Sequence, residues 1–195
     1  MSTPTNASTD RRARAGFTLF CISFLLFCAA LGGTLYQFIA EIPNWSGGTR
    51  AEFAAYRGFF RVSHAGYFFQ TLVPALILTL LAATVLLRNR PRNTNRLLLA
   101  ALAGVVSIEL FTGIYFLPRI FIIFLEPLAG VSDAALYMAS REWQVANIIR
   151  FGMTLGTLVL YLRIAYRLVA SQVLASSKRT VTQPQRTAVN APVPA

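Results

Sequence analysis

Residues 17–40 read FTLFCISFLLFCAALGGTLYQFIA, a stretch without one charged side chain. Three further long apolar stretches follow, at about 67–87, 97–123 and 145–170. Each is long enough for the roughly 20 residues that a helix needs to cross a hydrocarbon core of about 30 Å. Because lipid offers the backbone no hydrogen-bond partner, each stretch must satisfy its own amides as a helix. The sequence therefore predicts an all-α, polytopic membrane protein built as an antiparallel bundle of four transmembrane helices.

The composition agrees with a membrane protein of one domain. Of the 195 residues, 55% are hydrophobic and only 13% are charged, whereas soluble domains carry about 25% charged residues. We expect a transmembrane domain over residues 16–170. The polar or proline-containing tails, 1–15 and 171–195, are expected to be disordered.

The distribution of the net charge of +11 predicts the orientation of the bundle. Of the 18 basic residues, twelve fall on one side of the expected membrane: Arg11, Arg12, Arg14, Arg88, Arg90, Arg92, Arg96, Arg163, Arg167, Lys178, Arg179 and Arg186. Since basic residues favour the cytoplasmic face, both termini are expected in the cytoplasm, with the protein in the cell membrane. The charge thus indicates a lipid bilayer as partner. No basic motif interleaved with aromatic residues indicates nucleic acid, and the oligomeric state is left open.

The segment between the first two apolar stretches has a helical pattern of its own. Phe53, Phe60 and Tyr67 recur every seven residues, and arginines form an adjacent stripe. This predicts an interfacial amphipathic helix that runs on into the second transmembrane helix. A second outer segment, about 125–142, contains another short helical stretch around 132–139.

Polar residues within the apolar stretches are the best indication of a site, because they are costly in lipid and usually face the bundle interior. In the fourth stretch six residues fall on one helical face: Trp143, Asn147, Arg150, Thr154, Thr157 and Tyr161. In the third stretch Glu109 lies near mid-membrane, at a depth from which Arg150 can reach it. We expect these two residues to interact, directly or through water.

The other two helices add Tyr36 and His64 at their outer ends, while the inner halves of all four are plain and leucine-rich. This asymmetry predicts a cavity that opens toward the outer face. The alternative is that the polar side chains only hold the helices together. For His64 alone, interfacial packing competes with an acid–base role.

Other site chemistries find little support in the sequence. A single histidine cannot provide bis-histidine haem ligation, and no metal-ligating motif occurs. Gly32 and Gly33 are expected to allow close helix packing. We therefore expect no metal and no cofactor.

Three short motifs occur in order along the helices. Gly-Gly-x-x-Tyr followed by Pro-Asn-Trp spans 32–45, Tyr-Phe-x-Pro spans 115–118, and Trp-x-x-x-Asn-x-x-Arg spans 143–150. Over roughly residues 17–168 the chain resembles the anthrone-oxygenase-like family of small four-helix membrane proteins, most of whose bacterial members have no assigned activity. The resemblance implies oxidation of anthrones to anthraquinones without an evident metal or flavin.

Two hypotheses about function follow. In the first, the protein is a cofactor-independent oxidoreductase acting on a hydrophobic aromatic or quinone-like molecule. His64, Glu109 and Arg150 would then be catalytic, and Tyr36, Trp143 and Asn147 would bind the substrate. In the second, the protein is a non-enzymatic partner subunit or a small lipid- or solute-binding protein.

Overall fold

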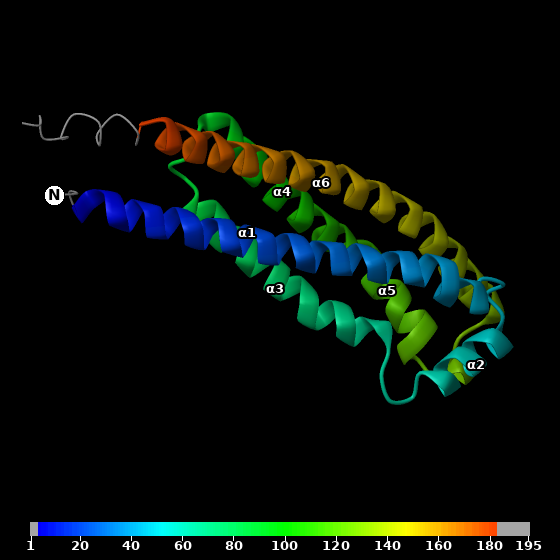
Figure 1. The fold of residues 1–195 in the computed structure, drawn as a ribbon. Helices are drawn as coiled ribbons and strands as arrows, with labels where there is room; N and C mark the ends of the chain where they lie inside the picture. The colour runs from blue at the N-terminus through cyan, green and yellow to red at the C-terminus, as the bar shows by residue number, and fades with distance from the viewer. Residues whose placement is uncertain (1–3, 183–195) are drawn as a thin grey trace, which may run out of the picture.

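The computed structural model describes residues 4–182, and within that range the chain is helical without any strand. Four helical spans are long and apolar enough to cross a membrane: Ser8–Asn44, Ala65–Leu86, Arg92–Leu125 and Asp133–Ser171. The prediction of an all-α bundle of four such helices is confirmed. The spans form an elongated bundle (Figure 1). We call the end near both termini the terminal end, and the opposite end, which carries residues 41–64 and 125–133, the loop end.

The first span is a long helix whose geometry changes near the loop end. Helix α1, Pro4–Tyr36, continues into a π-helical turn, η1 (Gln37–Glu41), and then a 3₁₀ turn, η2 (Ile42–Asn44). Pro43 lies in the first turn of η2, where its missing N–H is tolerated. The side-chain amide of Asn44 donates to the carbonyl of Ala40 at 2.6 Å, which satisfies one of the carbonyls freed at the end of the helix.

Helix α2, Arg50–Phe59, is the short helix that the sequence predicts between the first two spans. It begins with a capping box, in which the Thr49 hydroxyl accepts from the Glu52 amide and the Glu52 carboxylate accepts from the Thr49 amide. Gly48 precedes it with φ +74°, and a Cβ there would lie 2.8 Å from the Cα of Tyr137. Glycine therefore lets the chain turn into α2 against the fourth span.

The expectation that this helix runs on into the second transmembrane helix is wrong. The helix ends at Phe59, and α3, Ala65–Leu86, starts after a break with His64 in extended conformation as its N-cap. The Nδ1 of His64 accepts from the Gly66 amide at 3.0 Å, and this local bond competes with continued helix. Consequently the proposed stripe does not share one face, since Phe53 is fully buried while Tyr67 is 54% exposed.

The third and fourth spans are joined by a short turn. Helix α4, Arg92–Phe111, continues through η3 (Thr112–Phe116), α5 (Leu117–Ile120) and η4 (Phe121–Leu125); after η5 (Leu128–Gly130), helix α6 runs over Asp133–Thr182. The helical stretch expected around 132–139 exists, but it is the first part of α6 and not a separate helix.

The two tails differ from the expectation of disorder where the structure describes them. Helix covers 4–15 and 171–182, while 1–3 and 183–195 of those tails lie outside the described residues.

The spans pack as two pairs, α1 with α3 and α4 with α6, and α3 also contacts α4. Near the terminal end the pairs close on one apolar core, to which α1 contributes Phe20 and Phe27 and α6 contributes Tyr161. The Tyr161 hydroxyl lies 2.7 Å from that of Ser23, so even the polar atoms there are paired.

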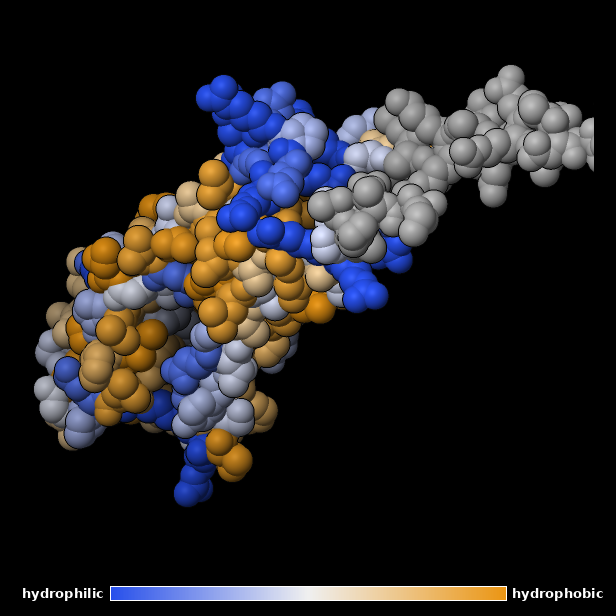
Figure 2. All heavy atoms as spheres, turned by 90° about the vertical axis from the view of Figure 1, so that its left-hand side faces the viewer, coloured by the Kyte–Doolittle hydropathy of each residue, from blue (hydrophilic) through white to orange (hydrophobic). Residues whose placement is uncertain are grey.

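The surface of the bundle is apolar where lipid would contact it. Leu25, Leu78 and Ile148 are each more than 60% exposed. Figure 2 shows hydrophilic side chains gathered at the terminal end, a hydrophobic surface next to them, and hydrophilic side chains again among hydrophobic ones farther away. On α6 the predicted polar face is buried, and Ile149 and Leu155 face outward.

Candidate functional site

A cavity of about 700 Å³ lies in the loop-end half of the bundle. Its walls come from both helix pairs and from α2, so it occupies the space between the pairs on the loop-end side of their common core. Most of the lining is apolar or aromatic, including Phe27, Phe69, Phe116 and Trp143. The predicted cavity at one end of the bundle is therefore present.

Arg150 of α6 is the cation that reaches into this cavity from the fourth span. Its Nη2 donates to Asn147 at 2.6 Å and to Gln37 of η1 at 3.2 Å. Its guanidinium carbon lies 4.5 Å from the centre of the Phe116 ring, a cation–π geometry. Its Nε is buried and has no partner among the described residues. The guanidinium is thus held in place by Gln37, Asn147 and Phe116, while its buried Nε–H has no partner among the described residues.

A second polar group meets Arg150 from the first span. Glu41, at the end of η1, is only 5% exposed and lines the cavity. The Tyr56 hydroxyl of α2 donates to its Oε1. Its Oε2 is buried without a partner among the described residues. The charges of Glu41 and Arg150 are close enough to attract each other.

Glu109 lines the cavity from α4. Of the interaction expected with Arg150, directly or through water, the direct ion pair is not formed. The ion pairs within the described residues join Arg14 to Asp10, Arg50 to Asp133 and Arg119 to Glu142. The charges of Glu109 and Arg150 still influence each other, while the guanidinium of Arg150 makes its hydrogen bonds to Gln37 and Asn147.

The structure separates the remaining predicted site residues. His64 and Trp143 line the cavity, His64 at its exposed rim and Trp143 as a buried wall. Asn147 is fully buried beneath Arg150 and does not line the cavity, so it positions the guanidinium. Tyr36 is 57% exposed and also lies outside the lining, because Gln37, the next residue along the helix, takes the inward face.

Among the cavity residues that were not site candidates, three form the polar contacts around Arg150 and Glu41: Gln37, Glu41 and Tyr56. The first two lie four residues apart in the π-helical turn η1, so both face inward. Their spacing in the outer part of an apolar helix was a usable signal. Tyr56 carries no comparable signal, because only the folded loop end brings α2 over the first span.

Wide helical turns gather around the cavity. The π-helical turns of the described chain are η1, η3 and η4, and each contributes lining residues. Such turns are rare and recur at functional sites, because the extra residue re-aims side chains and loosens the regular ladder of backbone bonds. Here each of the three turns contributes a residue to the lining of the cavity: Glu41, Thr112 and Phe124.

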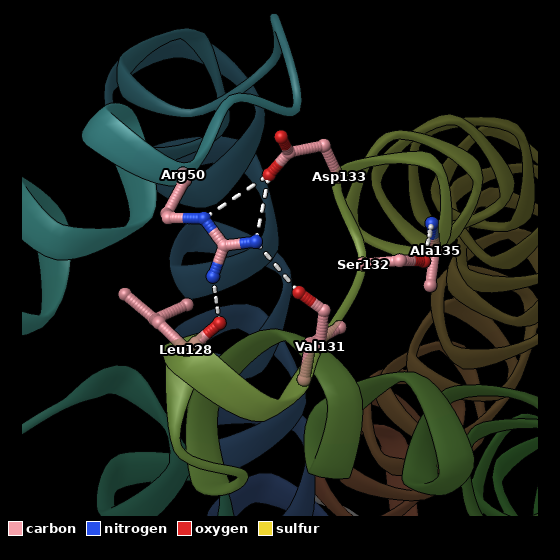
Figure 3. Close-up of polar contacts among 6 residues, drawn as sticks. All are labelled: Arg50, Leu128, Val131, Ser132, Asp133 and Ala135. Atoms are coloured by element: carbon pink, nitrogen blue, oxygen red, sulfur yellow. Dashed lines mark hydrogen bonds and ion pairs between the residues drawn. The ribbon is translucent and has the colours of Figure 1, made fainter.

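Arginines hold the outer rim in place. Arg50 of α2 reaches between η5 and the start of α6, where it donates to the carbonyls of Leu128 and Val131 and to Asp133 (Figure 3). Arg57, about two turns further along the same face of α2, lines the cavity and donates to the carbonyl of Ile123. These contacts tie α2 to the ends of the third and fourth spans.

Comparisons with known proteins add no homologue: no family model, no curated protein and no solved structure matches the chain. The candidate site therefore rests on its own geometry. Within the described residues, no group of three or more His, Cys, Asp or Glu side chains could hold a metal ion.

Proposed function

We propose that the protein binds a hydrophobic aromatic or quinone-like molecule in the loop-end cavity and oxidises it without a cofactor. The observation that carries the proposal is the cavity itself. Its volume of about 700 Å³ falls in the range of small-molecule sites, roughly 300–1,000 Å³. Apolar walls with a few convergent polar groups, among them Arg150, are the usual character of such a site.

The resemblance of the sequence to anthrone oxygenases supports a particular reaction. A methylene group flanked by aromatic rings and activated by a carbonyl loses a proton to a base, for which His64 and Glu109 are the candidates. The resulting enolate carries its charge on oxygen, where Arg150 stabilises it. Its carbon then bonds to O₂, and the protonated hydroperoxide loses water. The balance is R₂CH₂ + O₂ → R₂C=O + H₂O, with the proton returned from the base.

The proposed orientation indicates how an apolar substrate would enter the cavity from the membrane. With both termini in the cytoplasm, as the basic residues predict, the cavity lies in the outer half of the membrane. Exposed apolar side chains flank its rim, such as Phe59 and Val62, which are 82% and 95% exposed. These side chains would contact the outer leaflet, from which an apolar substrate would partition into the cavity.

Oxygen uptake with an anthrone tests the reaction. Protein in nanodiscs should consume oxygen above the protein-free rate, and Arg150→Ala should lower that rate by about 100-fold, the loss typical of a removed oxyanion partner. Arg141→Ala is the matched control, since Arg141 is exposed outside the cavity. Equal rates for wild type and Arg150→Ala, or no uptake by either, would contradict the proposal.

A non-enzymatic membrane protein is the second candidate, and one contact favours it. Arg150 links α6 to the first span through Gln37, which would also lock a bundle that has no activity. In that case Arg150→Ala and Gln37→Ala lower bundle stability with strong coupling and change no turnover. A double-mutant cycle of stability in detergent distinguishes the two candidates.

A further inference from the structure

Glu41 and Arg150 line the same cavity, and each has one buried polar atom without a partner among the described residues. The two atoms differ in kind. The Oε2 of Glu41 is a buried acceptor without a partner, and the Nε of Arg150 is a buried donor without one. A buried polar atom without a partner costs roughly 1–3 kcal/mol, and native proteins leave few of them. Because Glu41 is only 5% exposed and lines the cavity, a ligand that packs against it there is the candidate for the missing partner.

The surroundings keep the two atoms in these roles. The other oxygen of Glu41 accepts from Tyr56, so the carboxylate cannot turn Oε2 away without breaking that bond. The Nη2 of Arg150 donates to Gln37 and Asn147, which holds the guanidinium in place. Burial, then the hydrogen bond and charge of Glu41, raise the pKa of Tyr56 above its ordinary value of 10.0, which keeps the phenol protonated as a donor.

A single functional group, a hydroxyl, can bind both the acceptor of Glu41 and the donor of Arg150. A hydroxyl can donate its proton to Glu41 and accept from Arg150 through the same oxygen. A carbonyl or ether offers only an acceptor, and a carboxylate would be repelled by Glu41. We propose that Glu41 and Arg150 form a hydroxyl-binding subsite, oriented by Tyr56, which selects apolar ligands that carry a neutral hydroxyl group. The proposal rests on the ligand-binding part of the proposed function and does not depend on oxidation.

The lining next to the subsite fits a flat apolar body behind that hydroxyl. Phe116 and Trp143 meet edge to face, with ring centroids 4.7 Å apart, and both line the cavity. Aromatic walls favour stacked or edge-on aromatic ligands. A bicyclic aromatic alcohol is therefore a suitable probe.

The test compares 2-naphthol with 2-methoxynaphthalene, which keeps the oxygen acceptor but lacks the hydroxyl proton. Binding is measured by retention on protein-loaded nanodiscs, with retention on empty nanodiscs subtracted. Wild type should bind 2-naphthol at least about tenfold more tightly than its ether, the discrimination that one buried hydrogen bond to a charged group provides.

Glu41→Gln should remove this preference. With Tyr56 still donating to the amide oxygen, the amide nitrogen takes the place of Oε2 and becomes a donor. Naphthol affinity should fall at least about tenfold while ether affinity changes less than about threefold, which also shows that the cavity is intact. Glu126→Gln, at an exposed residue outside the cavity, should behave as wild type.

The outcomes separate the subsite from the cavity. Equal binding of both probes by wild type, or an unchanged preference in Glu41→Gln, would overturn the subsite and leave the proposed cavity function standing. No specific binding of either probe would overturn both. If Glu41→Gln does not fold, the preference of wild type still decides, and Tyr56→Phe, which releases the carboxylate, should reduce it.

Discussion

At the scale of single residues, the candidate site depends on which side chains form hydrogen bonds with each charged group. Arg150 was expected to meet Glu109, but Gln37 and Asn147 take its Nη2. The consequence is that two carboxylates, Glu41 and Glu109, face the cavity without an ion pair to Arg150. Buried charges that are incompletely paired are costly, so this arrangement is expected to serve binding and not stability.

The Tyr56–Glu41 pair predicts a specific pH dependence of stability. The folded state holds the pKa of Tyr56 above 10.0, mainly through burial and then through Glu41. As pH rises past about 10, the unfolded chain loses this proton and the folded chain keeps it, so the free energy of unfolding falls. Below that pH the contribution is fully present.

Tyr56→Phe should therefore be less stable than wild type at about pH 8, by roughly 1–3 kcal/mol, because Glu41 loses its donor. The gap should shrink as the pH approaches about 11. Thermal unfolding in detergent at several pH values measures it, with Tyr166→Phe as a control because Tyr166 is 76% exposed. A gap that stays constant with pH would show that Tyr56 does not hold its proton in this way.

At the scale of elements, the bundle depends on a few close approaches and on the rim contacts of α2. Gly33, as expected, lies where a Cβ would come 2.7 Å from Phe68, so it allows α1 to approach α3. Gly32, its neighbour, meets nothing within 4 Å, and that half of the expectation is wrong. A helix shows only one face to its partner, so adjacent glycines cannot both be contact points.

Gly104 is the corresponding approach between α4 and α6. A Cβ there would lie 2.6 Å from the Thr157 hydroxyl, and Thr157 is 4% exposed with no room to retreat. Gly104→Ala should lower the free energy of unfolding by roughly 1–3 kcal/mol through overpacking. Gly156→Ala is the matched control, since nothing lies within 4 Å of its Cβ. Equal stability of the two variants in a detergent unfolding titration would contradict the packing described.

Arg50 is expected to order the junction before α6. Arg50→Met removes its bonds to two carbonyls and to Asp133, at a cost of roughly 1.5–3 kcal/mol. Most of this belongs to the carbonyl bonds, because Asp133 is 78% exposed and an exposed pair contributes little. Amide hydrogen exchange at residues 128–136 should accelerate, whereas Arg141→Met should leave it unchanged. Unaltered exchange in Arg50→Met would argue against this role.

At the scale of the whole molecule, two helix pairs close at the terminal end and enclose the cavity toward the loop end. The orientation of that architecture in a membrane is a prediction from the basic residues. It can be tested in a background in which Cys21 and Cys28 are replaced by alanine. Ser63→Cys, at the loop end, should react with an impermeant maleimide in intact cells. Asn89→Cys, in the α3–α4 turn, should react only after permeabilisation, and the reverse pattern would invert the proposed topology.

Much of the fold could be predicted because membrane helices are specified locally. An apolar stretch of sufficient length must be helical in lipid, whatever its neighbours are. The inward face of α6 also followed from its own periodicity, since Trp143, Asn147 and Thr154 are all buried. These properties depend on the spacing of residues along one helix, which the sequence contains in full.

Only the tertiary structure decided which helices pack together and which hydrogen-bond partner each polar atom has. Tyr56 reaches Glu41 across 15 positions of sequence, and Arg150 reaches Gln37 across 113. The break before His64 is different, because it goes with a local bond to Gly66 that helical periodicity does not predict. The sequence alone determined four helices with their polar groups toward one end. The packing of those helices decided that Glu41 and Arg150 line one cavity and that each has a buried polar atom without a partner among the described residues, because contacts between helices depend on tertiary packing and not on residue spacing along one helix.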